Sequence, residues 1–268
     1  MEEQILFLVY GIRQDHPTMG LRDMYYKLQP EGIGRDKFEA LCKAANLTVE
    51  RRPNFRRTTD SSGVVRFDNL LTNLEITRVN QVWQSDITYF EVGGRFYYLT
   101  FITDAFTRVI VGHHVSASLQ TEHTTLAALQ AAEKFRRSKK MNIDHVILHS
   151  DGGGQYYDKN FLVYTAELNI QNSMCRHPWE NGKAERINGI IKNNYLQHRN
   201  IRNFNELVKE VDRSVQLYNC EKPHIKLNRK TPIQFENSIF AQQLQHSSKS
   251  KVFQGIDGSI KVKEPADD

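Results

Sequence analysis

The segment VWQSDITYFEV, residues 82–92, is the clearest fold signal in the sequence. Its residues alternate between the two faces of a β-strand, and two glycines separate it from a second β-rich run at residues 95–103. A third run follows at residues 109–116, so we expect three consecutive antiparallel strands. Asp86 lies inside the first of them. Because aspartate is depleted in strand interiors, packing alone does not explain why Asp86 is there.

Beyond these strands, helical and strand patterns alternate. We expect a helix over 121–137, a strand over 144–149, a helix over 161–168, a strand over 170–175 and a helix over 181–196. Three antiparallel strands followed by such crossovers imply a mixed five-stranded sheet with helices on both faces. Among common α/β folds, this order matches the ribonuclease H-like arrangement.

The first 50 residues have a helical pattern instead. Apolar residues recur at helical spacing over 5–12, 18–28 and 35–45, and a four-residue turn containing Pro30 separates the last two helices. This spacing fits a helix-turn-helix, and it fits a plain three-helix packing unit equally well.

Periodicity also suggests where the domains end. Residues 51–78 show weak periodicity and contain four arginines within seven residues, which either contact phosphates or are simply solvated. We expect five regions: a helix-turn-helix-like domain at 1–50, a linker at 51–78, an α/β core domain at 79–200, a helical extension at 201–240 and a polar tail at 241–268.

The composition is that of an ordinary globular protein. Of 268 residues, 36 are Lys or Arg and 31 are Asp or Glu, so the formal charge is +5, which permits a polyanionic partner without identifying one. Three scattered cysteines, Cys42, Cys175 and Cys220, support neither a disulfide framework nor a zinc ribbon. No apolar run approaches the ~20 residues of a membrane span. We expect a cytoplasmic protein that binds no membrane.

Asp86 is one of three acids whose positions suggest a common site. Asp151 follows the fourth expected strand and precedes three glycines that let the backbone turn sharply and a ligand approach. Glu185 lies on the helix after Pro178, on the same face as Lys192. Taken singly, Asp151 could form a turn and Glu185 could be solvated. Together, the carboxylates would repel each other unless they hold cations, and two Mg²⁺ or Mn²⁺ ions suit oxygen ligands beside a phosphate.

Three motifs in this order resemble a known family. VWQSDITYF (82–90), HSDGGGQY (149–156) and NGKAERINGIIK (181–192) resemble the catalytic core of the DDE transposases of bacterial insertion sequences, whose relatives include the retroviral integrases. Glu185 follows Asp151 by 34 residues, close to the family spacing. The segment over 16–47 resembles the helix-turn-helix of this family, and YNCEKPHIKLNRKTPIQF (218–235) resembles its C-terminal signature.

The resemblance implies that Asp86, Asp151 and Glu185 are the catalytic, metal-binding triad and that Trp83 packs beneath the first strand. It further implies DNA contacts by Lys192, Lys183, Arg186, Arg35 and Lys37. A basic cluster farther away, over residues 134–140, is better explained as a solvated helix end.

The resemblance also implies an activity and partners. The chain would cut the ends of an insertion sequence and transfer the exposed 3′ hydroxyl to another phosphodiester, with no covalent enzyme intermediate. Its partners would be double-stranded DNA at inverted-repeat ends and at the target, further copies of the chain, and a DNA-binding module from an upstream reading frame; it would act on DNA in the bacterial cytoplasm. Two alternatives stay open: a ribonuclease H-like nuclease without strand transfer, and a decayed transposase acting as a DNA-binding regulator.

Overall fold

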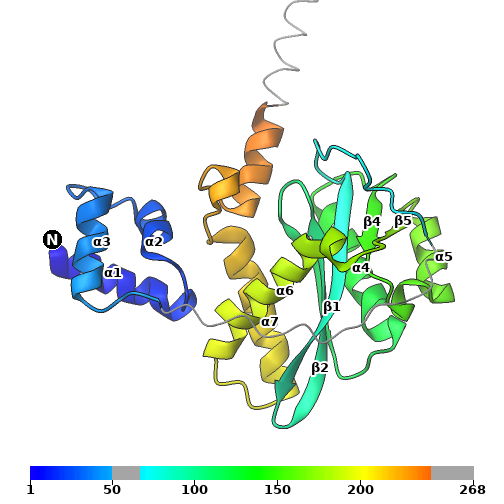
Figure 1. Cartoon of the computed structure of the whole chain (residues 1–268), viewed down its shortest axis with the longest axis horizontal. Coiled ribbons are helices and arrows are strands. Elements are labelled where there is room, and N and C mark those ends of the chain that lie inside the picture. The colour runs from blue at the N-terminus through cyan, green and yellow to red at the C-terminus, as the bar shows by residue number, and fades with distance from the viewer. Residues whose placement is uncertain (50–66, 243–268) are drawn as a thin grey trace, which may run out of the picture.

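A five-stranded sheet forms the centre of the core, and helices cover both of its faces (Figure 1). The computed structural model describes residues 1–49 and 67–242, so the four clustered arginines of the expected linker and nearly all of the polar tail lie outside the described residues. The strands are β1 (Val82–Val92), β2 (Arg95–Asp104), β3 (Ile110–Ser116), β4 (Ile147–Ser150) and β5 (Gln171–Met174).

The strands are ordered β3-β2-β1-β4-β5 across the sheet. Strands β1, β2 and β3 are antiparallel neighbours, and the two-residue turn between β1 and β2 uses the positive φ angles of Gly93 and Gly94, 59° and 76°. Strand β4 runs parallel to both β1 and β5. This topology confirms the predicted ribonuclease H-like mixed sheet.

Helices flank the sheet, and short 3₁₀ turns connect several elements. The helices of the core and its extension are α4 (Thr125–Ser138), α5 (Lys159–Glu167), α6 (Gly182–Asn194) and α7 (Phe204–Cys220), with a further helix over residues 232–242. The 3₁₀ turns are η1 (Thr121–His123), η2 (Gly154–Tyr156), η3 (Pro178–Asn181), η4 (Leu196–His198) and η5 (Ile225–Leu227).

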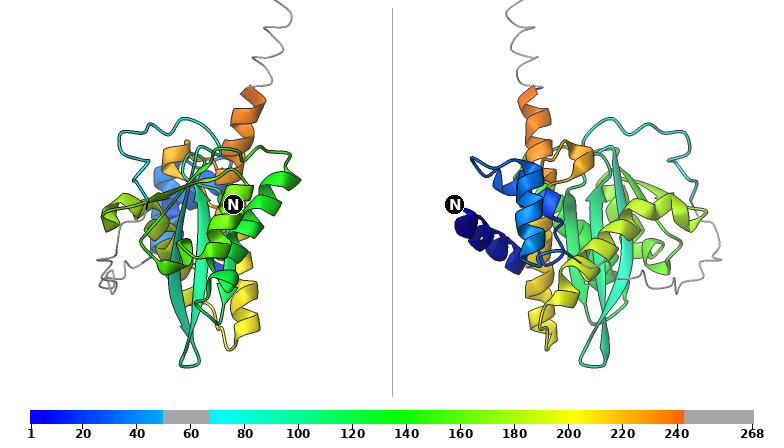
Figure 2. Two further views of the ribbon diagram at one scale, coloured as in Figure 1. Left: turned by 90° about the vertical axis from the view of Figure 1, so that its right-hand side faces the viewer. Right: turned by 60° about the vertical axis from the view of Figure 1, so that its left-hand side comes forward.

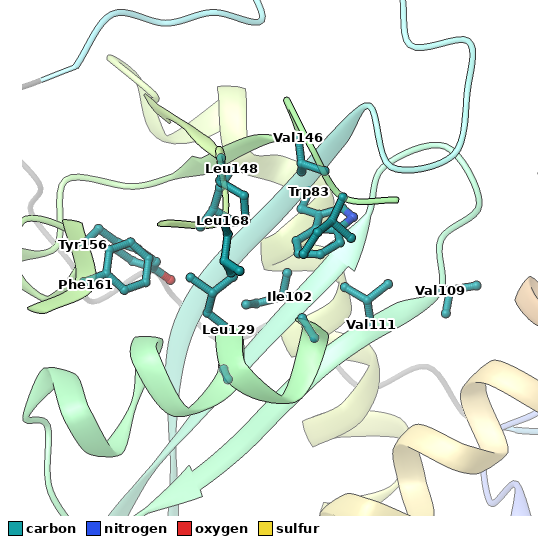
Figure 3. Close-up of a cluster of buried hydrophobic side chains, with 14 residues drawn as sticks. Trp83, Ile102, Val109, Val111, Leu129, Val146, Leu148, Tyr156, Phe161 and Leu168 are labelled. Atoms are coloured by element: carbon teal, nitrogen blue, oxygen red, sulfur yellow. The ribbon is translucent and has the colours of Figure 1, made fainter. Parts of the chain in front are cut away.

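The period of two along β1 divides its side chains between two cores. Trp83 and Ile87 belong to the cluster formed with α4 and α5, where Trp83 lies near Ile102 (Figure 3). Phe90 and Val92 belong to the opposite cluster, formed with α6 and α7. Trp83 is fully buried, which confirms its predicted structural role. Asp86, at an even position like Phe90 and Val92, therefore faces α6.

The N-terminal residues form a helical unit with its own core. Its helices are α1 (Glu2–Asp15), α2 (Leu21–Leu28) and α3 (Arg35–Ala44), and they enclose a cluster that includes Val9, Met24, Phe38 and Cys42. The connection between α2 and α3 covers the six residues 29–34, so the expected length of four is wrong, and Gln29 at its start has a left-handed conformation with φ of 45°.

Ion pairs attach the N-terminal unit to the side of the core that α6 and α7 cover (Figure 2). Asp15 pairs with Arg213 of α7 at 2.6 Å, and Lys27 pairs with Glu221 at 2.9 Å. His16, which is buried, lies 3.1 Å from the hydroxyl of Tyr195. The unit is therefore docked, through polar contacts, at the end of α6.

Two sequence predictions in the core are wrong in detail. The fourth strand begins at Ile147 instead of residue 144, because His145 has a positive φ of 59° that a strand does not allow. The basic cluster at 134–140 is not entirely a solvated helix end, since Arg136 is fully buried between Asp104 and Glu236. Arg136 is thus part of the core.

Candidate active site

Asp86 and Asp151 lie side by side on neighbouring parallel strands. The register pairs Val82 with Ile147 and Gln84 with His149. Two residues further along each strand, the same register places Asp86 beside Asp151, with both side chains on the same face. Adjacent strands are about 4.8 Å apart, which brings the two carboxylates close together. Asp151 follows the C-terminal end of β4, where ligands of open α/β sheets gather.

The two aspartates share an environment that disfavours their charges. Burial, followed by the charges of Asp151 and Glu185, raises the pKa of Asp86 to about 8. Burial also raises the pKa of Asp151, although the backbone N–H of Gly153 donates to its Oδ1 at 3.1 Å. A cation placed between these groups would therefore stabilise their ionised forms.

The glycines after Asp151 are needed for space and not for a positive φ. A Cβ at Gly152 would lie 2.8 Å from the methyl carbon of Met174, and one at Gly153 would lie 3.1 Å from the Asp151 carboxylate. Neither glycine has a positive φ, so the bend that the chain makes here does not depend on the left-handed conformation that glycine allows. The absent side chains leave room beside the carboxylate.

Helix α6 brings Glu185 to the same face of the sheet. The Asn181 side chain donates to the carbonyl oxygen of Ser85 at 2.9 Å and so fixes the start of α6 on β1. Glu185 is exposed in the first turn of α6, and its charge contributes to the raised pKa of Asp86. The side chain of Asn188, one turn later, donates to Oδ2 of Asp86 at 2.8 Å.

Lys192 lies farther along the same face of α6. Its ammonium donates to the hydroxyl of Thr88 at 2.7 Å and lies 5.3 Å from the ring centre of Tyr89. Burial lowers the pKa of Lys192, and the charge of Asp86 opposes that shift. Lys192 is half-buried, and its ammonium is held at Thr88, two residues from Asp86 along β1. It therefore places a positive charge beside the acids.

The remaining predicted DNA contacts lie elsewhere. Lys183 and Arg186 do not point to the carboxylates but line a cavity on another side of α6. Arg35 forms an ion pair with Asp36 at 2.8 Å, and Lys37 is exposed on α3. The structure therefore brings Lys192 to the acids and separates the other four residues from them.

Sequence reasoning missed two polar residues at the site and one exposed aromatic residue that precedes it in sequence. Asn181 and Asn188 both precede a glycine and lie one turn before and after Glu185, a spacing that could have indicated them. Trp179, which is 72% exposed and stacks on His177 at 4.4 Å, had no signal beyond its place before Glu185. All three lie within ten residues of one another.

The donor set fits a hard divalent cation. Oxygen ligands from Asp86, Asp151 and Glu185 suit Mg²⁺ or Mn²⁺, and no Lys or Arg in the described part of the chain forms an ion pair with any of the three. Within residues 1–49 and 67–242, no three acids or other ligands are gathered closely enough to form a complete metal site. The two aspartates are paired in advance, whereas Glu185 is turned to solvent.

Among the described helices, none has both the length and the apolar composition needed to cross a membrane.

The chain is similar to known proteins over its core and the segment that follows it. A family model described as an integrase core domain matches residues 76–178, and a second integrase core domain model matches residues 166–232. A solved structure, the HTLV-2 integrase catalytic core domain in complex with magnesium, is 22% identical and covers 59% of this chain and 96% of its own, with a TM-score of 0.46.

Curated relatives align over most of their length. An uncharacterized 31 kDa protein of insertion element IS600 from Shigella sonnei is 29% identical over 225 residues, 81% of each chain. A putative transposase for IS986/IS6110 from Mycobacterium tuberculosis is 28% identical over 236 residues, 85% of each chain, and a putative transposase for IS150 from Escherichia coli is 28% identical over 86% of this chain and 78% of its own. On these matches, the chain belongs to the DDE transposases of bacterial insertion sequences, with an integrase core domain.

Proposed function

We propose that this transposase cuts DNA at the ends of an insertion sequence and joins the exposed 3′ hydroxyl to a target, using divalent metal held by Asp86, Asp151 and Glu185. The observation that supports the assignment best is the pair of neighbouring aspartates, with a pKa near 8 for Asp86 and no cation of the described chain to neutralise it. Two buried carboxylates without a cation lower the stability of the fold, and a metal site would account for that cost.

Bound there, two Mg²⁺ or Mn²⁺ ions would supply Lewis-acid activation of the attacking oxygen and charge stabilisation of the leaving oxygen. The chain itself holds the ligands in place. Asn188 orients the Asp86 carboxylate, and the backbone N–H of Gly153 orients that of Asp151. Glu185, which is exposed in the first turn of α6, would complete the ligand set.

Other residues would position the DNA strand. Lys192 is held by Thr88 beside the acids, where its charge would bind the phosphate next to the reacting one. Trp179 presents an exposed ring immediately before α6, and an aromatic face there would stack on an unpaired base at the cut end. The chain thereby supplies position and charge to the reaction.

The N-terminal unit would bind the inverted repeats. Arg35 and Lys37 begin α3, which would be the recognition helix of a helix-turn-helix. The outer side of α1 exposes Phe7, Leu8 and Tyr10, by 78%, 50% and 52%. This apolar surface supports a protein partner at the same end of the chain, either a second copy or a module from an upstream reading frame.

A cleavage and joining assay tests the proposal. The substrate is a labelled duplex of the inverted repeat that flanks the gene, with Mg²⁺ or Mn²⁺, and the variants are Asp151→Asn and Glu185→Gln. We expect metal-dependent cutting and joining by the wild type, and DNA binding without either reaction in both variants.

Each other outcome identifies a different function. Cutting without joining would make the chain a nuclease. Binding by a wild type that remains inactive, even when the upstream reading frame is fused to it, would make it a DNA-binding regulator. Undiminished joining by Asp151→Asn would overturn the assignment of the acids.

A further inference from the structure

A second polar site lies on another side of α6, away from the acids. A cavity of about 330 Å³ opens between α6, the turn from β2 to β3, and the segment that follows α7. We call it the basic cavity, and its charged and titratable side chains include Arg108, Lys183, Arg186, Lys222, His224 and Lys226. Three of these residues come from the core, and the other three come from the C-terminal signature.

The acids around the basic cavity do not neutralise it. Asp104 accepts from buried Arg136 at 3.2 Å and from backbone N–H groups, and Asp23 of α2 pairs with Arg229 at 2.5 Å. Within the described residues, no ion pair involves any of the five Lys and Arg side chains of the cavity. The cavity therefore holds a net positive charge.

The cations of the basic cavity oppose one another. Burial lowers the pKa of Lys183, and the charges of Arg108 and Lys226 lower it further. Burial and the charge of Arg186 lower the pKa of Lys222, while Asp23 acts in the opposite direction. Holding several cations in one partly buried place costs free energy, which an anion bound among them would recover.

A buried histidine nitrogen in the basic cavity lacks a partner. His224 packs edge-on against Tyr218, with ring centres 4.9 Å apart, and no described atom hydrogen-bonds to its buried Nε2. Burial and the charges of Lys222 and Arg108 lower the pKa of His224 to about 3, so the ring is neutral near pH 7. A neutral ring with its proton on Nε2 is a hydrogen-bond donor, and buried donors without partners are uncommon in folded proteins.

We propose that the basic cavity binds a backbone phosphate of the DNA strand on which the acids act. The proposal rests on the proposed function, because it supposes that the chain binds DNA. Arg186 follows Glu185 directly on α6, and consecutive helical residues point about 100° apart. A strand that crosses the start of α6 would therefore present one phosphate to the acids and another to the cavity. Guanidinium and ammonium groups with a neutral N–H donor suit a phosphate oxygen.

This assignment also gives the C-terminal signature a purpose. Lys222, Pro223 and His224 follow α7 and lie against α6, although Lys222 comes 28 residues after the last residue of α6, Asn194. The segment supplies the floor and two of the cations of a site whose other cations belong to the core. Its phosphate contact would fix the strand relative to Glu185.

The test compares the salt dependence of DNA binding in two variants of equal charge. One variant, Arg186→Gln/Lys222→Gln, alters the basic cavity. The other, Arg202→Gln/Lys209→Gln, removes two cations at the start of α7. Both carry Asp151→Asn so that the labelled inverted-repeat duplex stays intact, and both are checked by thermal melting. We expect the cavity variant to bind about tenfold more weakly, with a slope of log Kd against log salt smaller by about 2, because each removed cation no longer displaces a counterion from the DNA.

The outcomes separate this proposal from the proposed function. Equal Kd values and slopes for the two folded variants would overturn the cavity assignment while leaving the transposase assignment intact. A chain with intact cavity that binds no duplex, either alone or fused to the upstream reading frame, would overturn both. Inorganic phosphate and unlabelled duplex can each be added as competitors of the labelled duplex. If inorganic phosphate competes as well as an equal concentration of DNA phosphates does, the cavity is a small-anion site, and the assignment to DNA is overturned.

A second readout follows His224 itself. The ring proton resonances of His224, assigned with His224→Gln, should shift when the duplex is added to Asp151→Asn protein, and the shift should be absent in the cavity variant. Resonances that do not move on saturation with DNA would contradict the proposal.

Discussion

Two pairs of carboxylates lie in the same region of the fold and differ in how they are neutralised. Asp104, at the end of β2, and Glu236, in the helix over 232–242, both bind Arg136, which is fully buried, and Lys139 also binds Glu236 at 2.8 Å. Asp86 and Asp151, on β1 and after β4, form no ion pair with any Lys or Arg of the described residues. A structural acid is folded together with its countercharge, whereas the second pair is left for a cation from outside.

The largest expected effect comes from replacing the carboxylate of Asp86, in the pair that lacks an ion-pair partner among the described residues. We expect Asp86→Asn to lower the rate of strand cleavage by about 10⁴-fold, which corresponds to about 5 kcal/mol of transition-state stabilisation. The reason is that an amide replaces a carboxylate ligand while the shape of the site is kept. The measurement is single-turnover cleavage of the inverted-repeat duplex with Mg²⁺. Cleavage within tenfold of the wild type would mean that the unpaired aspartates are not the metal ligands.

Removing the cation from the neutralised pair should affect stability instead. Arg136→Met leaves Asp104 and Glu236 buried without their main partner, and we expect the free energy of unfolding to fall by about 4 kcal/mol. Urea unfolding measures it. Arg137→Met is the matched control, because Arg137 is 67% exposed on the same helix and pairs only with Glu133 among the described residues, so its loss should cost at most about 0.5 kcal/mol. Equal effects would show that the Asp104 pair contributes little to the fold.

The unneutralised pair should make stability depend on pH when metal is absent. The pKa of Asp86 is about 8 in the folded chain and about 3.9 in an unfolded one, so the folded state binds the proton more tightly. Stability from this group is therefore fully present below about pH 4 and is lost as the pH rises toward 8, by at most about 1.4 kcal/mol per unit. Urea unfolding in EDTA between about pH 6 and pH 8 should show a steeper loss for the wild type than for Asp86→Asn. Parallel curves would contradict the raised pKa.

The sequence predicts much of this comparison, and the reason lies in local pattern. The period of two over 82–92 predicts both the strand β1 and the face on which Asp86 lies, because side chains alternate strictly along a strand. The order of strands and helices likewise predicts the topology of the sheet.

The local sequence pattern does not show which residues pair when they are far apart in the chain. Arg136 and Glu236 are 100 residues apart, and nothing near Arg136 distinguishes it from the exposed Arg137 beside it. The directions of Lys183 and Arg186 depend on how α6 is rotated on the sheet, to which the hydrogen bond from Asn181 to Ser85 contributes. The resemblance to a family supplies residue roles but not these rotations.

The smallest predicted effect concerns Asn188, the polar contact that Asp86 has in place of a cation. Its amide donates to Oδ2 at 2.8 Å without neutralising the carboxylate, whereas the guanidinium of Arg136 donates to Asp104 and neutralises it. The amide therefore orients Asp86 and favours its ionised form, the form that a metal would bind, as hydrogen-bond partners of metal ligands do. We expect Asn188→Ala to lower cleavage by about tenfold at limiting Mn²⁺ and by less at saturating Mn²⁺, because a loosely held ligand weakens metal binding more than the chemical step. Asn193→Ala, an exposed change on the same helix, is the control and should leave both rates unchanged. If Asn188→Ala lowers the cleavage rate by the same factor at all Mn²⁺ concentrations, Asn188 acts on the DNA or on the fold. The contrast between an orienting amide and a neutralising guanidinium would then not explain why the two acid pairs differ.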